Sequence, residues 1–147
     1  MDKTEAQAAL AAMNEARAHV ALVAECPPWR HAAFGAVMAA PVMALGLGQP
    51  IQSVLFAGSM IGVLLIARDD RRRTGMFVNG YRKGRTRVVS FGLLAVFLVM
   101  IAGEVWLRES GAALAYRIAL AALSFVVAVW FSVVWSRIFK REMEEAA

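Results

Sequence analysis

Four long apolar stretches, separated by short polar segments, dominate the pattern of hydrophobic and polar positions in this chain. They cover residues 31–47, 51–67, 88–107 and 112–136. A bilayer-spanning helix needs about 20 apolar residues, because each residue advances the helix by about 1.5 Å and the hydrocarbon core is about 30 Å thick. The third and fourth stretches meet this length, and the first two are slightly short. The pattern predicts an all-α integral membrane protein, a four-helix bundle of two transmembrane hairpins.

The first hairpin is open to two interpretations. The segment Gly46–Pro50 reads GLGQP, and its Gly and Pro residues predict a tight turn. Pro41 lies inside the first stretch and is expected to kink it, which membrane helices tolerate. The pair could therefore be a re-entrant element that never fully crosses. Full crossing is favoured, because Pro50 is placed as a helix-start residue.

Basic residues are distributed unequally between the two sides of this arrangement. The basic loop 68–87 holds eight Lys and Arg residues and only two acids. With the N-terminal region and the C-terminal end, one side carries fourteen basic residues, and the other carries only Arg108 and Arg117. Cytoplasmic loops are enriched in Lys and Arg. We therefore predict a membrane domain over 29–141 and a cytoplasmic tail over 142–147, with both termini and the basic loop inside.

Composition supports a membrane setting and excludes several chemistries. The chain is 60% hydrophobic, above the usual 45–50% or so of soluble domains. A single cysteine excludes a disulfide framework, and two histidines are too few for a His-rich metal site. The net charge of +5 is interpreted as a topology signal, not as affinity for nucleic acid, because it gathers at segment ends. High Ala and Arg content indicates a GC-rich bacterial genome, so the predicted membrane protein is expected in a bacterial inner membrane. No cofactor or metal is expected.

Residues 1–28 are predicted to form a cytoplasmic amphipathic helix ahead of the membrane domain. The sequence TEAQ at residues 4–7 is typical of a capping box, and small apolar residues follow at helical spacing over 4–25. Pro27 and Pro28 should end this helix. Three roles stay open: packing on its own protein, pairing with another subunit, or lying on the lipid surface.

The basic loop has the only motif-like composition in the chain. Gly75, Gly80 and Gly84 recur at intervals of five and four residues. Glycine allows close backbone approach, and Arg side chains suit phosphate. No P-loop or GxGxxG pattern is present, so anionic lipid headgroups are the expected ligand. A plain connector and a protein-docking loop are the alternatives. The predicted lipid- or phosphate-binding residues are Arg71, Arg72, Arg73, Tyr81, Arg82, Lys83, Arg85 and Arg87.

Glu104 and Arg117 are predicted to form an intramembrane ion pair. A hairpin that turns near Ser110 and Gly111 places them at equal depth, and ionisable residues in a membrane are costly unless paired. Arg108, four residues after Glu104, is expected to compete for the same carboxylate. A pair that clamps the hairpin is favoured over a proton- or cation-coupling carboxylate. A catalytic acid has no second carboxylate or nucleophile beside it.

Small residues predict the helix contacts. Gly58 and Gly62 form a GxxxG pattern in the second stretch, and Ser124, Ala128 and Ser132 form a small face along the fourth. Whether these surfaces meet inside the chain or in a homo-oligomer or larger membrane complex stays open. Trp130 is predicted to be a packing residue.

The sequence therefore favours a small non-enzymatic membrane subunit or scaffold that engages anionic lipid headgroups, or a protein partner, through its basic loop. The alternative is a small oligomeric transporter or channel that uses Glu104. These two classes differ in one respect, since a transporter needs a polar path across the helices.

Overall fold

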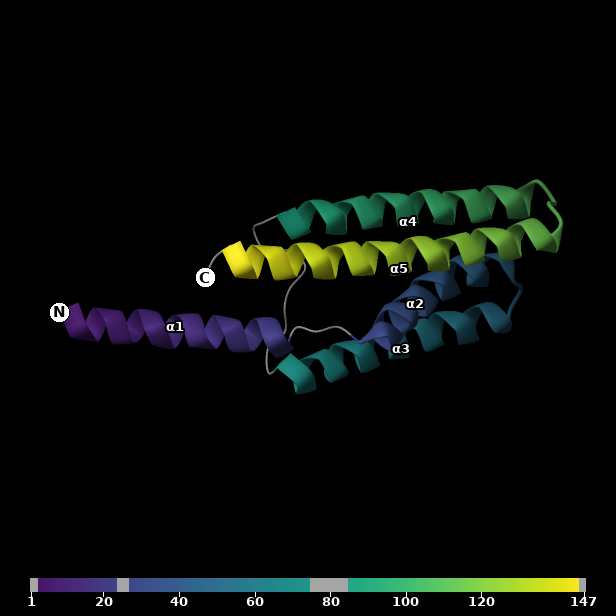
Figure 1. Cartoon of the computed structure of the whole chain (residues 1–147). Helices are drawn as coiled ribbons and strands as arrows, with labels where there is room; N and C mark the ends of the chain where they lie inside the picture. The colour runs from purple at the N-terminus through teal and green to yellow at the C-terminus, as the bar shows by residue number, and fades with distance from the viewer. Residues whose placement is uncertain (1–2, 24–26, 75–84, 146–147) are drawn as a thin grey trace.

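The computed structural model of the chain describes residues 3–23, 27–74 and 85–145. Within these residues, helices joined by short turns are the regular secondary structure. These ranges contain five α-helices and no strand (Figure 1). The helices are α1 (Lys3–Val23), α2 (Pro28–Gly46), α3 (Ile51–Thr74), α4 (Arg85–Glu109) and α5 (Leu114–Glu145).

Three of the described helices are long and apolar enough to cross a membrane. The qualifying segments are Ile51–Arg73 in α3, Arg87–Glu109 in α4 and Leu114–Glu142 in α5. Helix α2 does not join this group. It has 19 residues, and its first turn contains Trp29, Arg30 and His31, which shortens the apolar part. The membrane character of the chain is thus shown by three helices, and the crossing of α2 stays a prediction.

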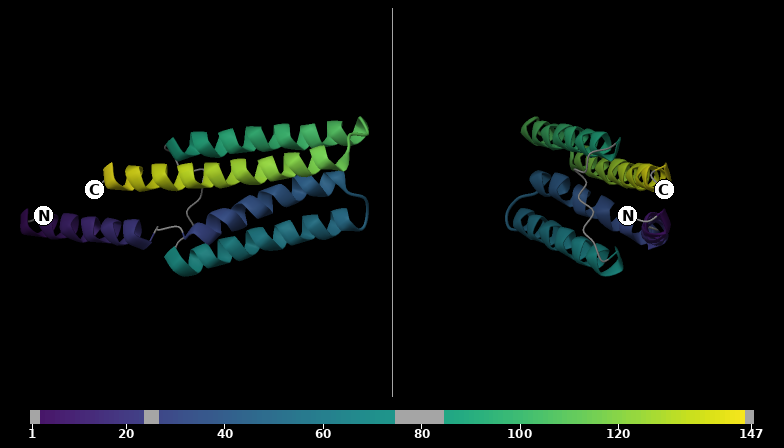
Figure 2. Two further views of the ribbon diagram at one scale, coloured as in Figure 1. Left: turned by 45° about the vertical axis from the view of Figure 1, so that its right-hand side comes forward. Right: turned by 90° about the vertical axis from the view of Figure 1, so that its left-hand side faces the viewer.

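Helices α2 to α5 lie side by side in the order α3, α2, α5, α4 (Figure 2). Helix α2 contacts α3 on one side and α5 on the other, and α4 packs on α5 and reaches α2. Among the described residues, α3 contacts neither α4 nor α5. The row is therefore open between α3 and α4. Helix α1 extends away from the end where α3 stops and α4 begins, and contacts α3 and α5 (Figure 1).

Several helix boundaries differ from the prediction. Helix α3 continues to Thr74, so the first seven residues of the predicted basic loop are helical. Arg is a good helix former, and its charge at a helix C-terminus interacts favourably with the helix dipole. Helix α5 likewise runs to Glu145, into the predicted tail. Helix α1 already includes Lys3, so the prediction of Thr4 as its N-cap is wrong.

The interior of the row is built mainly from small and polar side chains, with Val42 and Phe139 among them, and many large apolar side chains face outward. Ser124, Ala128 and Ser132, the predicted small face of α5, are all buried, and α5 lies against α2. Leu64 on α3 and Val99 on α4 are 68% and 69% exposed. In water such exposure over whole helices would favour aggregation, whereas lipid chains solvate it.

Two residues that are predicted to pack, Gly58 and Trp130, are exposed in this chain. A Cβ built on Gly58 meets no atom within 4 Å, so Gly58 does not contact another helix here. The contact to α2 comes from Gly62 and from the buried Ser59 instead. Trp130 is 59% exposed, because it lies about 200° around the helix from the buried Ala128. A contact of Gly58 or Trp130 with another subunit stays a prediction.

Candidate functional site

Basic side chains from three helices gather at one end of the row. Arg71, Arg72 and Arg73 are exposed in the last turn of α3, and Arg87 is exposed near the start of α4. Helix α5 ends at the same place and adds the exposed Arg137 and Arg141 (Figure 1). Of the remaining predicted ligands, Arg85 begins α4, whereas Tyr81, Arg82 and Lys83 lie outside the described residues.

Asp69 and Asp70, the two acidic residues of α3, bind basic residues of the same chain. Asp69 pairs with Arg73 one turn later on α3, at 2.9 Å from Nε to Oδ2. The Arg73 guanidinium also lies over the Trp29 ring, 5.5 Å from its centroid. Asp70 accepts two hydrogen bonds from Arg30 of α2, at 2.6 Å from Nε and 2.5 Å from Nη2. Arg73 is thus held by internal contacts, and it differs in this respect from the predicted ligand Arg72.

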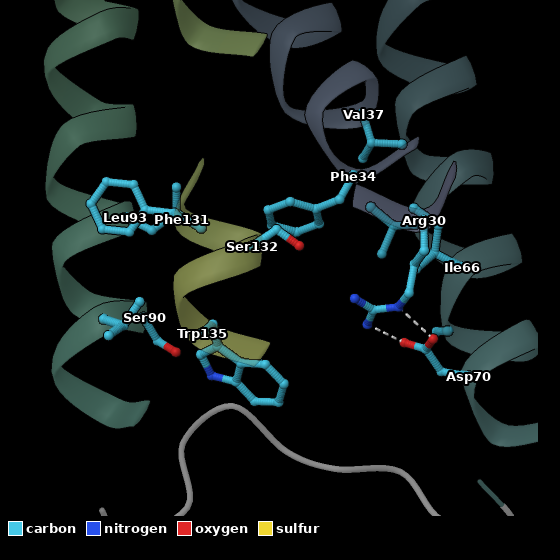
Figure 3. Close-up of a pocket in the computed structure, with 13 residues that line it drawn as sticks. Arg30, Phe34, Val37, Ile66, Asp70, Ser90, Leu93, Phe131, Ser132 and Trp135 are labelled. Atoms are coloured by element: carbon cyan, nitrogen blue, oxygen red, sulfur yellow. Dashed lines mark hydrogen bonds and ion pairs between the residues drawn. The ribbon is translucent and has the colours of Figure 1, made fainter. Parts of the chain in front are cut away.

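A groove of about 310 Å³ opens between α3 and α4 at this basic end (Figure 3). Helices α2 and α5 form its floor, since α3 and α4 do not touch. Its deeper part is apolar and is lined by Phe34, Val37, Val63, Ile66, Leu93 and Phe131. The sequence could not reveal this groove, because its width depends on the spacing between helices that are not neighbours in the chain.

Most polar side chains of the groove lie toward its basic end, whereas Ser132 lies level with Phe131 and Phe34 (Figure 3). The Arg30–Asp70 pair forms one side, and Ser90 and Trp135 lie opposite (Figure 3). Ser132 also lines the groove, and its Oγ lies 2.8 Å from Nδ1 of His31. The groove therefore has an amphipathic lining, apolar at depth and hydrogen-bonding at the mouth.

Sequence reasoning missed the Arg30–Asp70 pair, although a signal for it exists. Both residues lie twenty positions from Pro50, which directly precedes α3. The symmetry argument that joined Glu104 to Arg117 in the second hairpin also joins these two residues in the first. The predicted basic loop 68–87 includes Asp70, whereas α3 carries it on a helix opposite Arg30.

The structure brings Glu104 and Arg117 together at the opposite end of the row. Arg117 Nε donates to Glu104 Oε1 at 3.1 Å, and the Glu104 side chain is 0% exposed. Glu104 Oε2 and Arg117 Nη2 are buried without a hydrogen-bond partner among the described residues. Gly46, the last residue of α2, makes room for the pair, since a Cβ there would collide with Glu104 Oε1 and lie 2.7 Å from Arg117 Nη2.

The sequence predicts that Arg108 competes for Glu104, but Arg108 binds a different group in the structure. Its Nη1 donates to the Leu45 carbonyl at 3.1 Å, near the C-terminus of α2. The last carbonyls of a helix have no partner within the helix, so a guanidinium is a favourable cap. Arg108 therefore ties α4 to the end of α2, and the Glu104–Arg117 pair packs against Gly46 beside it.

The buried serines use their hydroxyl groups for contacts within the protein. Ser59 Oγ of α3 donates to the Val37 carbonyl of α2 at 2.8 Å. Ser124 Oγ donates to the Leu120 carbonyl, one turn earlier on α5, at 2.9 Å. These hydroxyls join or brace helices, which weakens the case for a polar path that leads from Glu104 toward the basic end.

Comparison with known proteins adds no relative: no protein-family model, no curated protein and no solved structure matches the chain.

Proposed function

We propose that this chain is a four-span protein of a bacterial inner membrane that binds anionic lipid headgroups at its basic end, and that it serves there as a non-enzymatic membrane subunit or scaffold. One observation carries the proposal: exposed Arg side chains from the ends of α3, α4 and α5 gather at one end of a row of outwardly apolar helices. In this proposal both termini are cytoplasmic.

The two ends of the row differ in how their basic residues are used. Arg108 and Arg117, the basic residues of the opposite end, are bound to the Leu45 carbonyl and to Glu104. Arg72 and Arg137 project from the basic end as exposed side chains, and the exposed Arg87 lies over the Phe91 ring of its own helix, 5.4 Å from the centroid. An anionic cytoplasmic leaflet attracts each such residue by about 1 kcal/mol, so several together favour one orientation and retain anionic lipid.

Lipid retention tests this proposal. We expect the triple variant Arg71→Gln/Arg72→Gln/Arg73→Gln to retain less phosphatidylglycerol in native mass spectrometry after extraction from mixed vesicles. Raising the salt concentration should reproduce the loss in the unmodified protein, because screening weakens the same attraction. Equal retention by the triple variant and the unmodified protein would reduce the basic end to a connector.

A matched pair of single variants sharpens this test. Arg72→Gln and Arg73→Gln remove the same charge from the same helical turn. Arg73 is held by Asp69 and Trp29, so we expect Arg73→Gln to lose less lipid than Arg72→Gln. Equal losses would show that net charge alone, not the exposed geometry, determines retention.

A second candidate function rests on the buried Glu104 carboxylate, whose Oε2 has no partner among the described residues. A transporter or channel could bind a proton or cation there. Reconstitution into vesicles tests it, since a coupled carboxylate predicts ion flux that Glu104→Gln abolishes. The pairing with Arg117 and the engaged serines make this candidate the weaker one.

A further inference from the structure

The groove between α3 and α4 has a shape and lining suited to binding a single lipid acyl chain. It spans Val63 to Asp70 on α3, a rise of about 10 Å along the helix. Its volume of about 310 Å³ falls at the lower end of the usual range for ligand pockets. Since α3 and α4 do not touch, the groove opens sideways, toward the surface where the large apolar side chains of the row are exposed.

The polarity of the groove determines which way a lipid would lie in it. Phe34, Val37 and Leu93 line the part farther from the basic end, where an acyl chain is best solvated. Arg30, Asp70 and Ser90 line the mouth. These polar groups suit the ester and glycerol region of a lipid, which carries hydrogen-bond acceptors and hydroxyl groups.

Charge complementarity selects the headgroup. Arg71 directly follows Asp70 at the mouth, and Arg87 precedes Ser90 by three residues on the same face of α4. Both basic side chains are exposed. A phosphate above the groove would therefore lie between the basic ends of two helices, where an anionic headgroup is favoured over a zwitterionic one.

We infer that the groove between α3 and α4 holds the part of one acyl chain nearest the headgroup of an anionic phospholipid, whose phosphate lies at the basic ends of these two helices. The inference rests on the proposed function and goes beyond it. Attraction of headgroups to the basic end requires no pocket, whereas the groove predicts one lipid that is bound by its chain as well as by its charge.

Trp135 lies in the groove and reports on its contents. The test uses a protein whose other tryptophans, Trp29, Trp106 and Trp130, are changed to Phe. In phosphatidylcholine vesicles, we expect acyl-chain-brominated phosphatidylglycerol to quench Trp135 fluorescence more than its mole fraction in the vesicles predicts for random contact. Brominated phosphatidylcholine at the same fraction should quench it less. Unbrominated phosphatidylglycerol should compete and restore the fluorescence.

Trp130 provides the matched control, because it lies on the same helix, is 59% exposed and does not line the groove. A protein that keeps only Trp130 should be quenched equally by the two brominated lipids. Equal quenching of Trp135 by both lipids would overturn the groove as a lipid-binding site. The proposed function would survive that result if the Arg71/Arg72/Arg73 variant still lost phosphatidylglycerol, and both would fail if it did not.

Filling the groove gives an independent test. Leu93→Trp places a large side chain in the groove, and Leu94→Trp places one on the exposed side of the same helix. In the unmodified protein, we expect phosphatidylglycerol to remain bound during extraction in gentle detergent. The Leu93→Trp variant should lose this bound lipid, and the Leu94→Trp variant should retain it. Equal retention by both folded variants would contradict the inference. If Leu93→Trp does not fold, the Trp135 measurement decides.

Discussion

At the residue scale, Glu104 is a fully buried carboxylate held by one guanidinium group. Arg117 Nε supplies its only hydrogen bond among the described residues, and Oε2 has none. Removing one member of such a pair leaves a charge in a poorly hydrated site, which costs more than removing both. The pair therefore stabilises the α4–α5 hairpin mainly because separating Glu104 from Arg117 would leave two unpaired buried charges.

A double-mutant cycle measures this coupling. We expect Glu104→Gln and Arg117→Gln each to lower the free energy of unfolding more than the double variant does, with a coupling of about 0.5–3 kcal/mol. Arg108→Gln is the control, since Arg108 binds the Leu45 carbonyl, and its effect should add to that of Glu104→Gln. Strictly additive effects of Glu104→Gln and Arg117→Gln would reject the clamp and favour the transporter.

Gly46 provides a second prediction about the same site. Its Cα faces the ion pair so closely that any Cβ would collide with Glu104 Oε1. We expect Gly46→Ala to reduce the free energy of unfolding by about 1–3 kcal/mol, as overpacking does. Gly48→Ala meets no atom within 4 Å and should change stability by no more than about 0.5 kcal/mol. The free energies of unfolding are measured in detergent micelles. Similar values for the two variants would show that the ion pair does not lie against Gly46.

At the scale of helices, the contact between α2 and α3 depends on small residues of α3. A Cβ on Gly62 would lie 2.5 Å from Val37 Cγ2, whereas a Cβ on Gly58 meets open space. Val is stiff about its first side-chain torsion, so Val37 cannot turn away without cost. We expect Gly62→Ala to destabilise the protein by about 1–3 kcal/mol.

Gly58→Ala serves as the control for this helix contact. Replacing glycine by alanine in an open helical position should be neutral or stabilising, by up to about 1 kcal/mol. Thermal unfolding of both variants, with native mass spectrometry of their oligomeric state, checks the pair. A loss of oligomer in Gly58→Ala would assign Gly58 to a contact between subunits. A destabilised monomer would contradict the open position of Gly58.

The same scale shows which contacts could be predicted from the sequence. Helix α4 and helix α5 were predictable because their apolar runs are long. The meeting of Glu104 with Arg117 followed from their equal distance to a turn between Ser110 and Gly111. Arg30 and Asp70 obey the same symmetry, but the helical continuation of α3 into the basic segment was needed to see it. Trp130 and Gly58 were misplaced because the rotation of a helix about its own axis depends on its neighbours.

At the scale of the whole molecule, the helices form an open row whose two ends use charge differently. One end presents exposed Arg side chains, and the other holds Arg108 and Arg117 in contacts with Leu45 and Glu104. The groove arises from the same openness, because it lies where α3 and α4 do not meet. The proposed orientation, the attraction of anionic lipid and the lipid-binding groove all depend on the basic end facing the cytoplasm.

The most direct test of this arrangement is cysteine labelling from the outside of intact spheroplasts with a membrane-impermeant maleimide. In a protein with Cys26→Ser, single cysteines at Gly48 and Ser110 test the two turns, and a cysteine at Arg137 tests the basic end. We predict labelling at positions 48 and 110 in intact spheroplasts, and at position 137 only after permeabilisation. Labelling of position 137 from outside, or protection of position 48, would contradict a four-span protein with its basic end inside.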